Sequence, residues 1–213
     1  KIFELSENRT KNDSLKKIEE YVGPTLDRLE ELSKKQGELI GLSSGFKAVD
    51  GVTQGLQKED LIVIAGRPSM GKTSLAMNIA ENVAKEEDGC VLVFSLEMSS
   101  ESLTSRMLAS MAGISQQSFR SANLTDRQWE KTIQKAKKLE SMNIHIDDKP
   151  NISPMEIRAK ARRLAKQYRK DGGVKLVVVD YIHLMQMPGR TENRVNELQL
   201  FHGSNLFLNN NNR

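Results

Sequence analysis

The chain carries the octapeptide Gly66-Arg67-Pro68-Ser69-Met70-Gly71-Lys72-Thr73, which matches the phosphate-binding pattern G-x-x-x-x-G-K-[ST] in full. The apolar run before it, residues 61–65, is short, β-branched and bounded by glycine, and so predicts a first buried strand. The residues after it predict a helix from about Lys72 through Val83. Because the pattern requires a strand before it and a helix after it, the sequence predicts a P-loop that binds a nucleoside triphosphate.

Each residue type in this loop has a chemical reason. Gly66 and Gly71 let the backbone turn so that successive N–H groups converge on phosphate oxygens. The helix N-terminus adds a favourable dipole, and Lys72 reaches the β- and γ-phosphates, which gives it a catalytic role as well. The Thr73 hydroxyl can bind Mg²⁺. The predicted cofactors are therefore ATP and Mg, and the predicted nucleotide-binding residues are Gly66, Arg67, Pro68, Ser69, Met70, Gly71, Lys72, Thr73 and Ser74.

Further apolar runs predict three more strands, at 91–94, 144–146 and 176–179. Three helices are predicted between them. The first is capped by Ser100 and runs through about Ala112. The second begins with a capping box at Thr125 and runs to about 142, and the third begins with a capping box at Ser153 and stops at 172–173. This alternation predicts an α/β domain with a mostly parallel sheet flanked by helices. Ligands in such domains lie beyond the carboxyl ends of the strands.

Two carboxylates follow predicted strands at that edge. Asp180 ends the run 176–179, where an acid can hold the Mg²⁺ water shell; an aspartate that caps a turn is the alternative. Glu97 follows the run 91–94, where it could orient or deprotonate the attacking water. An exposed glutamate before a helix explains Glu97 equally well. The predicted metal ligands are Thr73 and Asp180, with Asp180 acting through water.

The composition bounds the class of protein. The chain has 213 residues, a formal net charge of +4 from 32 basic and 28 acidic residues, and one cysteine, Cys90. A single cysteine excludes an internal disulfide framework and suits a small core residue in a reducing compartment. No apolar run approaches the roughly 18 residues needed to cross a bilayer. The sequence thus predicts a cytoplasmic protein with no membrane contact.

Changes in amino-acid composition along the chain predict three parts. Residues 1–38 are highly charged, with apolar residues three or four apart as on one helix face and an interruption at Gly23-Pro24, which predicts a helical linker. Residues 39–199 hold the predicted ATPase core. Residues 200–213 are rich in asparagine and are left unassigned.

Basic side chains and histidines give weaker signals. Arg190 and Arg194 follow the last predicted strand on a Pro-Gly loop at the ligand edge, where a DNA contact and an ordinary surface loop are equally good readings. The basic helix 154–170 favours a solvated face over nucleic acid. The three histidines have no metal-ligand spacing, so no zinc site is predicted.

These residues together resemble a known family, the replicative hexameric DNA helicases of bacteria and their phages, or DnaB family, with a RecA-like motor core. The resemblance covers about residues 1–199. It is carried by the P-loop 66–73, by Ser95-Leu96-Glu97-Met98 followed by Arg106-Met107-Leu108-Ala109, by Val179-Asp180-Tyr181 with Leu184-Met185, and by the lead-in 41–56. The joint set is far more specific than a P-loop alone.

The resemblance implies an ATP-dependent DNA helicase that works as a homo-hexameric ring, translocating 5′ to 3′ along single-stranded DNA and separating the duplex. It implies that Glu97 is the catalytic glutamate and that the first residues form a linker helix that packs on the adjacent subunit. A helicase loader and a primase are the implied partners in the primosome.

The chain also departs from this family. Ile182-His183 stands where leucine and glutamine are common, and the strands, sensor glutamine and arginine finger that follow the Asp180 strand have no counterpart. We therefore expect the 213 residues by themselves to have little or no activity. Two alternatives are a strand-exchange or clock-type RecA-like ATPase, which the Ser95–Met98 run argues against, and a nucleotide-binding interaction module for a helicase loader or other replication partner.

Overall fold

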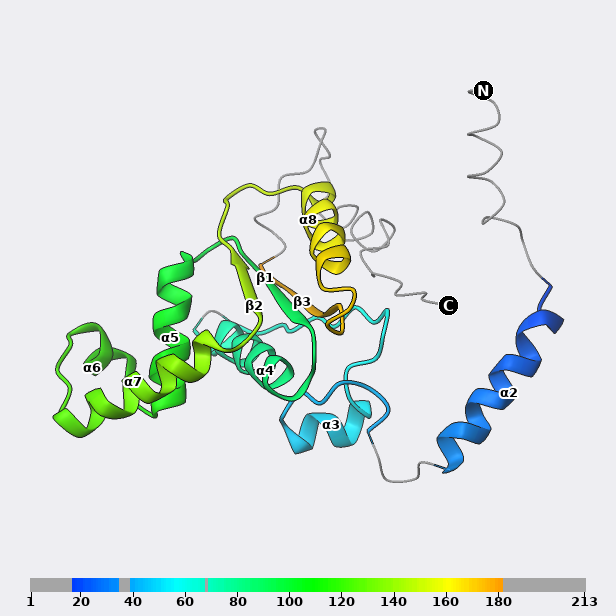
Figure 1. Ribbon diagram of the computed structural model, residues 1–213, viewed down its shortest axis with the longest axis horizontal. Helices are drawn as coiled ribbons and strands as arrows, with labels where there is room; N and C mark the ends of the chain where they lie inside the picture. The colour runs from blue at the N-terminus through cyan, green and yellow to red at the C-terminus, as the bar shows by residue number, and fades with distance from the viewer. Residues whose placement is uncertain (1–16, 35–38, 68, 182–213) are drawn as a thin grey trace, which may run out of the picture. The chain divides into compact units, whose positions relative to one another are not determined.

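The computed structural model describes residues 17–34, 39–67 and 69–181. The chain divides into two compact units, Lys1–Ile40 and Gly41–Arg213. The first unit contains the helix α2, Glu19–Lys34, and the second contains every strand among the described residues (Figure 1).

The second unit is built on a three-stranded parallel sheet in the order β2-β1-β3. The strands are β1 (Cys90–Ser95), β2 (Ile144–Asp147) and β3 (Val174–Asp180), which confirms three of the four predicted strands. Phe94 lies opposite Asp147 of β2 and opposite Val179 of β3. The three strands thus end together at one edge of the sheet.

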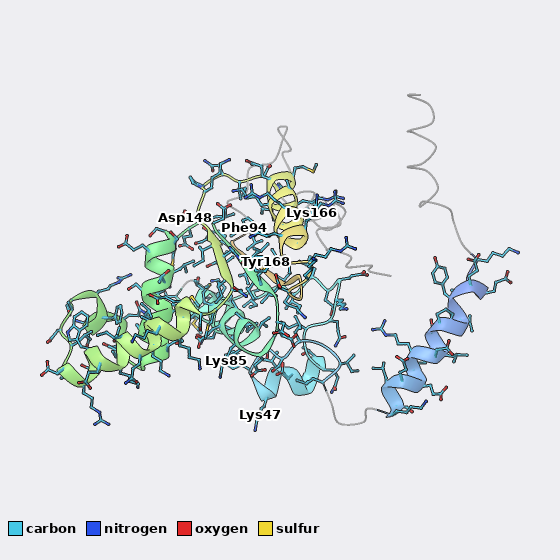
Figure 2. The ribbon with its side chains drawn as sticks, in the orientation of Figure 1. Lys47, Lys85, Phe94, Asp148, Lys166 and Tyr168 are labelled. Carbon is cyan, nitrogen blue, oxygen red and sulfur yellow. The ribbon has the colours of Figure 1, made fainter. Side chains whose placement is uncertain are left out.

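The central strand β1 is buried along its whole length and divides its side chains between two cores. Val91 and Val93 pack against α4 (Lys72–Glu86) and α5 (Ser100–Ala112). Leu92 and Phe94 pack against α8 (Pro154–Gln167) on the opposite face (Figures 1 and 2). A strand buried on both faces has a continuous run of apolar residues, which is why β1 could be recognised in the sequence.

The connection from α4 to β1 fixes the direction of α4. Only residues 87–89 separate them, so α4 runs back along the sheet and its first residue, Lys72, lies at the edge where β1 ends. Gly89 makes this turn at φ 118°, and a Cβ there would lie 2.5 Å from the Gly173 carbonyl oxygen. No other residue type fits without a shift of backbone.

The predicted first strand is wrong for the described residues. Leu61 to Ile64 are 37–66% exposed and form no ladder with any described strand. Both sides of β1 are occupied by β2 and β3, and the segment pairs with neither outer edge. An apolar β-branched run predicts burial, but a strand also needs a partner for its backbone groups.

The predicted helices form, with corrections at their ends. α4 begins at Lys72, and α7 (Asp126–Glu140) is opened by the predicted capping box of Thr125 and Gln128. The cap of α5 is Ser99 rather than Ser100, because the Ser99 hydroxyl accepts the Ser102 N–H. α8 ends at Gln167, short of Gly172, since the chain turns back over 168–173.

Two short helices were not predicted. α3 (Lys47–Thr53) lies in the lead-in 41–56, and α6 (Gln116–Arg120) follows α5. Buried Asp50 of α3 accepts hydrogen bonds from the Ser44 N–H and the Ser43 hydroxyl, both at 2.9 Å. These local bonds stabilise a turn that has little apolar periodicity.

The capping box of α8 gives a pH-dependent prediction. Glu156 accepts from the Ser153 N–H at 3.0 Å and from the Lys149 ammonium at 2.7 Å. The Lys149 hydrogen bond is the largest cause that lowers the pKa of Glu156, from 4.5 to about 2. Because the pKa is lower in the folded protein, the carboxylate stabilises it above the unfolded pKa and loses this effect as the pH falls toward 2.

We therefore expect wild type to be more stable than Glu156→Gln by a constant margin above roughly pH 5. The margin should shrink between about pH 4.5 and pH 2. Urea unfolding of both proteins over this pH range measures it, with Glu130→Gln on the exposed face of α7 as a matched control. A margin that stays unchanged down to pH 2 would contradict the assignment.

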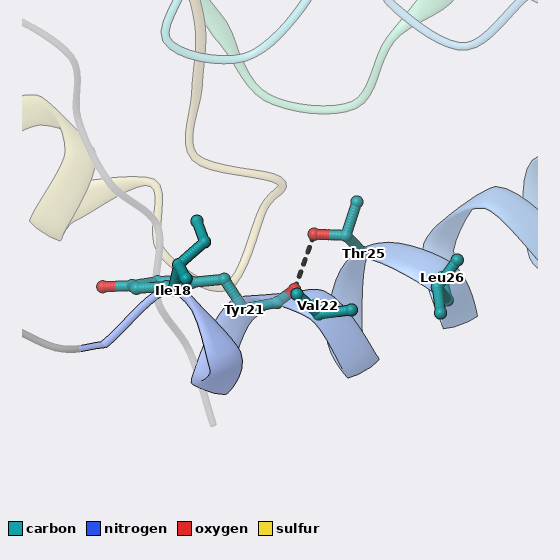
Figure 3. Close-up of a pocket in the computed structure, with 5 residues that line it drawn as sticks. All are labelled: Ile18, Tyr21, Val22, Thr25 and Leu26. Atoms are coloured by element: carbon teal, nitrogen blue, oxygen red, sulfur yellow. Dashed lines mark hydrogen bonds between the residues drawn. The ribbon is translucent and has the colours of Figure 1, made fainter.

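The first unit differs from its prediction at one point. α2 continues through Gly23-Pro24 instead of breaking there. Pro24 removes one backbone hydrogen bond, while the Thr25 hydroxyl donates to the Tyr21 carbonyl at 2.6 Å one turn back (Figure 3). The helix buries none of its residues, and its apolar face remains exposed at Ile18, Tyr21, Val22, Leu26 and Leu29.

None of the helices among the described residues is long and apolar enough to cross a membrane.

Candidate nucleotide-binding site

The P-loop turns sharply into α4. Ser69 and Gly71 both have positive φ, at 63° and 84°, and Gly71 is the N-cap of the helix. Gly71 carries no side chain to bond the first N–H groups of α4, so these donors face the loop. Donors at a helix N-terminus favour an anion by hydrogen bonding and by the helix dipole.

Lys72 turns back into this loop. Its ammonium donates to the carbonyl oxygens of Gly66 at 2.9 Å and Arg67 at 3.1 Å. The positive charge therefore sits inside the turn that the loop makes. Since the side chain has four rotatable bonds, the ammonium can leave these carbonyls for a phosphate without movement of the backbone.

The remaining P-loop side chains can be located from α4. Thr73 is half-buried in the first turn of the helix, next to Lys72, and Ser74 is exposed. Ser69 and Met70 are exposed in the turn. Pro68 lies outside the described residues.

Asp180 ends β3 at the same edge of the sheet. Its Oδ2 atom is buried and has no hydrogen-bond partner among the described residues. A buried carboxylate oxygen without a partner is costly, and a cation or a water held by a cation would satisfy it. Oxygen atoms of carboxylates and hydroxyls are also the ligands that Mg²⁺ prefers, so Asp180 and Thr73 fit this metal.

Glu97 lies in the loop that joins β1 to α5, and it is exposed. The Leu96 N–H donates to the Asp180 carbonyl oxygen at 2.7 Å. This bond ties the loop that carries Glu97 to the end of β3. The structure thus brings the end of β3, with Asp180, next to the loop that carries Glu97, at the edge of the sheet where α4 begins.

The other candidate residues divide between those that the structure describes and those that it does not. Arg190, Arg194, His183 and His202 lie outside the described residues. The remaining histidine, His145, pairs through Nε2 with the Tyr168 hydroxyl at 3.0 Å. In the part of the chain that the structure describes, no group of three histidine, cysteine or acidic side chains could hold a metal ion.

The basic helix α8 packs by its apolar face. Ile157 and Ala161 are buried against the sheet, and Lys160 forms an ion pair with Asp147 of β2. The basic residues of the helix that are exposed are Arg162, Arg163 and Lys166. This division between a buried apolar face and an exposed charged face is that of a solvated surface helix.

Sequence reasoning missed one residue at the carboxyl edge. Asp148 follows β2 and accepts the Ser100 N–H at the start of α5 at 2.7 Å. The only available signal was an aspartate directly after a predicted strand, the same signal that drew attention to Asp180.

Known proteins resemble this chain in sequence. Residues 41–203 match the family described as DnaB-like helicase C terminal domain. The replicative DNA helicase DnaB of Pasteurella multocida is 43% identical over 203 residues, which cover 93% of this chain and 43% of that protein. The replicative DNA helicase DnaC of Bacillus subtilis is 39% identical over 198 residues, covering 92% of this chain and 42% of that protein. The chain thus spans less than half the length of these relatives.

Solved structures resemble it in fold. One solved ATPase domain has a TM-score of 0.76 and 28% identity, over 88% of this chain and 65% of that one. A DnaB-like replicative helicase, whose structure was solved with regard to its interactions with primase, has a TM-score of 0.74 and 29% identity, over 83% of this chain and 42% of that one.

Proposed function

Because the chain belongs to the DnaB-like helicase family through that family's C-terminal domain, we propose that it is the motor part of a replicative DNA helicase. The motor hydrolyses ATP and uses the free energy to move 5′ to 3′ on single-stranded DNA and unwind the duplex. The observation that supports this most is the 2.7 Å bond from the Leu96 N–H to Asp180, since it joins the Glu97 loop to the predicted metal-binding strand.

In this proposal the P-loop binds the triphosphate. Backbone N–H groups of 66–73 and Ser74 hold the phosphates, and the Lys72 ammonium moves from the carbonyls of Gly66 and Arg67 to the β- and γ-phosphates. Thr73 and Asp180 would hold Mg²⁺, with Asp180 acting through water. When bound, Mg²⁺ neutralises charge on the phosphate oxygens.

Glu97 is the catalytic residue for the attacking water. Its carboxylate orients the water and takes a proton as the oxygen bonds to the γ-phosphorus and the bond to the β-phosphate oxygen breaks. Its exposure at a loop tip leaves the carboxylate open to solvent and able to meet such a water.

The partners follow from the same proposal. The protein acts in the cytoplasm as a homo-hexamer on single-stranded DNA, with a helicase loader and a primase as further partners. The exposed apolar face of α2, shown in Figure 3, supports a helical linker at 1–38 that docks on another subunit. Residues 39–199 belong to the ATPase core, Arg190 and Arg194 contact DNA, and 200–213 stay unassigned.

The test is made on the protein at its full natural length. We expect ATP-dependent strand displacement on a forked duplex, with ATP hydrolysis stimulated by single-stranded DNA. A Lys72→Ala version provides the background rate. Nucleotide binding without turnover or strand displacement would overturn the proposal in favour of an interaction module.

A further inference from the structure

We propose that Asp148 is a positioning residue that holds the Glu97 loop in its working geometry; this rests on the catalytic role of Glu97 proposed above. Asp148 lies on the loop after β2, which is 48 residues from Ser100 in sequence. Asp148 is labelled in Figure 2. Its Oδ2 atom accepts the Ser100 N–H at 2.7 Å. Glu97 is three residues before that bond.

The loop is fixed firmly on its β1 side. The Ser95 side chain, buried to 1% exposure, donates to the Met98 carbonyl at 2.6 Å and accepts the Met98 N–H at 3.3 Å. The Leu96 N–H is held by Asp180 of β3. Glu97 therefore stands between two residues whose backbones are bonded.

Asp148 supplies the anchor on the α5 side. Phe94 pairs with Asp147, so the sheet register brings the residue that follows β2 beside the start of the Glu97 loop. The hydrogen bond from the Ser100 N–H is the first cause that holds the pKa of Asp148 below its usual value. Asp148 is thus a carboxylate near neutral pH, and a bond to a charged acceptor is stronger than a neutral one.

This bond is not needed to start α5. The Ser99 hydroxyl already caps the helix by accepting the Ser102 N–H, and Leu103 fixes its first turn in the core at 0% exposure. What Asp148 adds is a tie between β2 and the exit of the Glu97 loop. Loss of that tie leaves the loop anchored on the β1 and β3 side but free to shift at its far end.

The consequence concerns turnover more than binding. A displacement of about 1 Å in a reacting group can cost on the order of 100-fold in rate. Asp148 lies on the β2 side of the loop, and its side chain bonds to the start of α5 rather than to the P-loop. We therefore expect Asp148→Ala to lower kcat for ATP roughly 10-fold or more, with KM little changed.

The test compares five variants of the full-length protein: Asp148→Ala, Asp148→Asn, Asp147→Ala, Glu97→Gln, and Glu97→Gln combined with Asp148→Ala. Asp148→Asn keeps an oxygen that can accept the Ser100 N–H, so it should restore most of kcat. Asp147→Ala is the matched control, because it removes the ion pair with Lys160 and the hydrogen bond from the Lys149 N–H at the neighbouring position but leaves the Ser100 bond. In a Glu97→Gln background, Asp148→Ala should cause no further loss of the residual rate, since it acts through Glu97.

Amide hydrogen exchange on the 213-residue chain gives a second readout. Exchange at Ser99 and Ser100 should rise in Asp148→Ala and stay near wild type in Asp148→Asn, while Leu96, which is anchored on Asp180, should exchange as in wild type in both. Normal kcat in Asp148→Ala, or an equal loss in both backgrounds, would overturn the inference while leaving the function intact. Normal turnover in Glu97→Gln would instead overturn the catalytic role on which the inference rests.

Discussion

Lys72→Ala is expected to abolish Mg²⁺-dependent binding of ATP and ADP by the 213-residue chain. The Lys72 ammonium lies inside the turn of the P-loop, where it donates to the carbonyl oxygens of Gly66 and Arg67. Charge-assisted hydrogen bonds to phosphate are each worth about 1.5–3 kcal/mol. The dissociation constant should therefore rise at least about 100-fold, which is about 2.7 kcal/mol.

Titration calorimetry on folded protein measures this loss. Lys85→Ala is the matched control, because Lys85 lies in the last turn of the same helix and is exposed. Its binding should match wild type. Equal affinity in Lys72→Ala and wild type, or no Mg²⁺-dependent binding by wild type, would refute the site.

The sequence predicted those parts of the fold in which local pattern and tertiary environment agree. β1 is buried on both faces by α4 and α8, so its continuous apolar run correctly predicts a buried strand. The capping boxes of α7 and α8 could be predicted because each is formed by residues within four positions of one another. The family resemblance and the RecA-like class are confirmed by the matches in sequence and fold.

The predictions of local structure failed at two segments, 61–65 and the turn at Pro24. The run 61–65 has strand propensity, but its backbone pairs with no described strand. Pro24 was expected to break a helix, yet α2 continues through it. Strand propensity and hydrophobicity describe a single segment, whereas strand pairing depends on two segments that meet in the fold.

The candidate site also has features that are local in the sequence and features that join distant residues. The P-loop is contiguous, so its residues could be proposed from the sequence, and Asp180 and Glu97 could be proposed because each lies at the end of a predicted strand. The bonds that join these parts could not. Leu96 to Asp180 spans 84 residues and Ser100 to Asp148 spans 48, and no pattern in one sequence reports such pairs.

Glu97→Gln and Asp180→Asn should separate two functions at this edge of the sheet. The first substitution keeps the shape of the Glu97 side chain but removes its ability to take a proton from water. The full-length protein should therefore bind ATP normally and lose most turnover, on the order of 10²–10⁴-fold. The Asp180 carboxylate has a buried oxygen with no partner among the described residues. Asp180→Asn replaces its charge by an amide and should weaken the response to Mg²⁺ as well as turnover.

The decisive comparison is the Mg²⁺ dependence of both variants, measured by nucleotide binding and by single-turnover hydrolysis. Glu97→Gln should keep the wild-type Mg²⁺ midpoint at a much lower rate, because it changes no proposed metal ligand. Asp180→Asn should need more Mg²⁺ for binding, because a buried position that lacks a partner would then lack its charge too. Near-normal turnover in Glu97→Gln would remove it from catalysis, and an unshifted midpoint in Asp180→Asn would remove Asp180 from the metal site.

Since the Leu96 N–H bonds to the Asp180 backbone carbonyl rather than to its side chain, neither substitution breaks the hydrogen bond between the Glu97 loop and the end of β3. Any difference between the variants therefore reports the two carboxyl groups themselves.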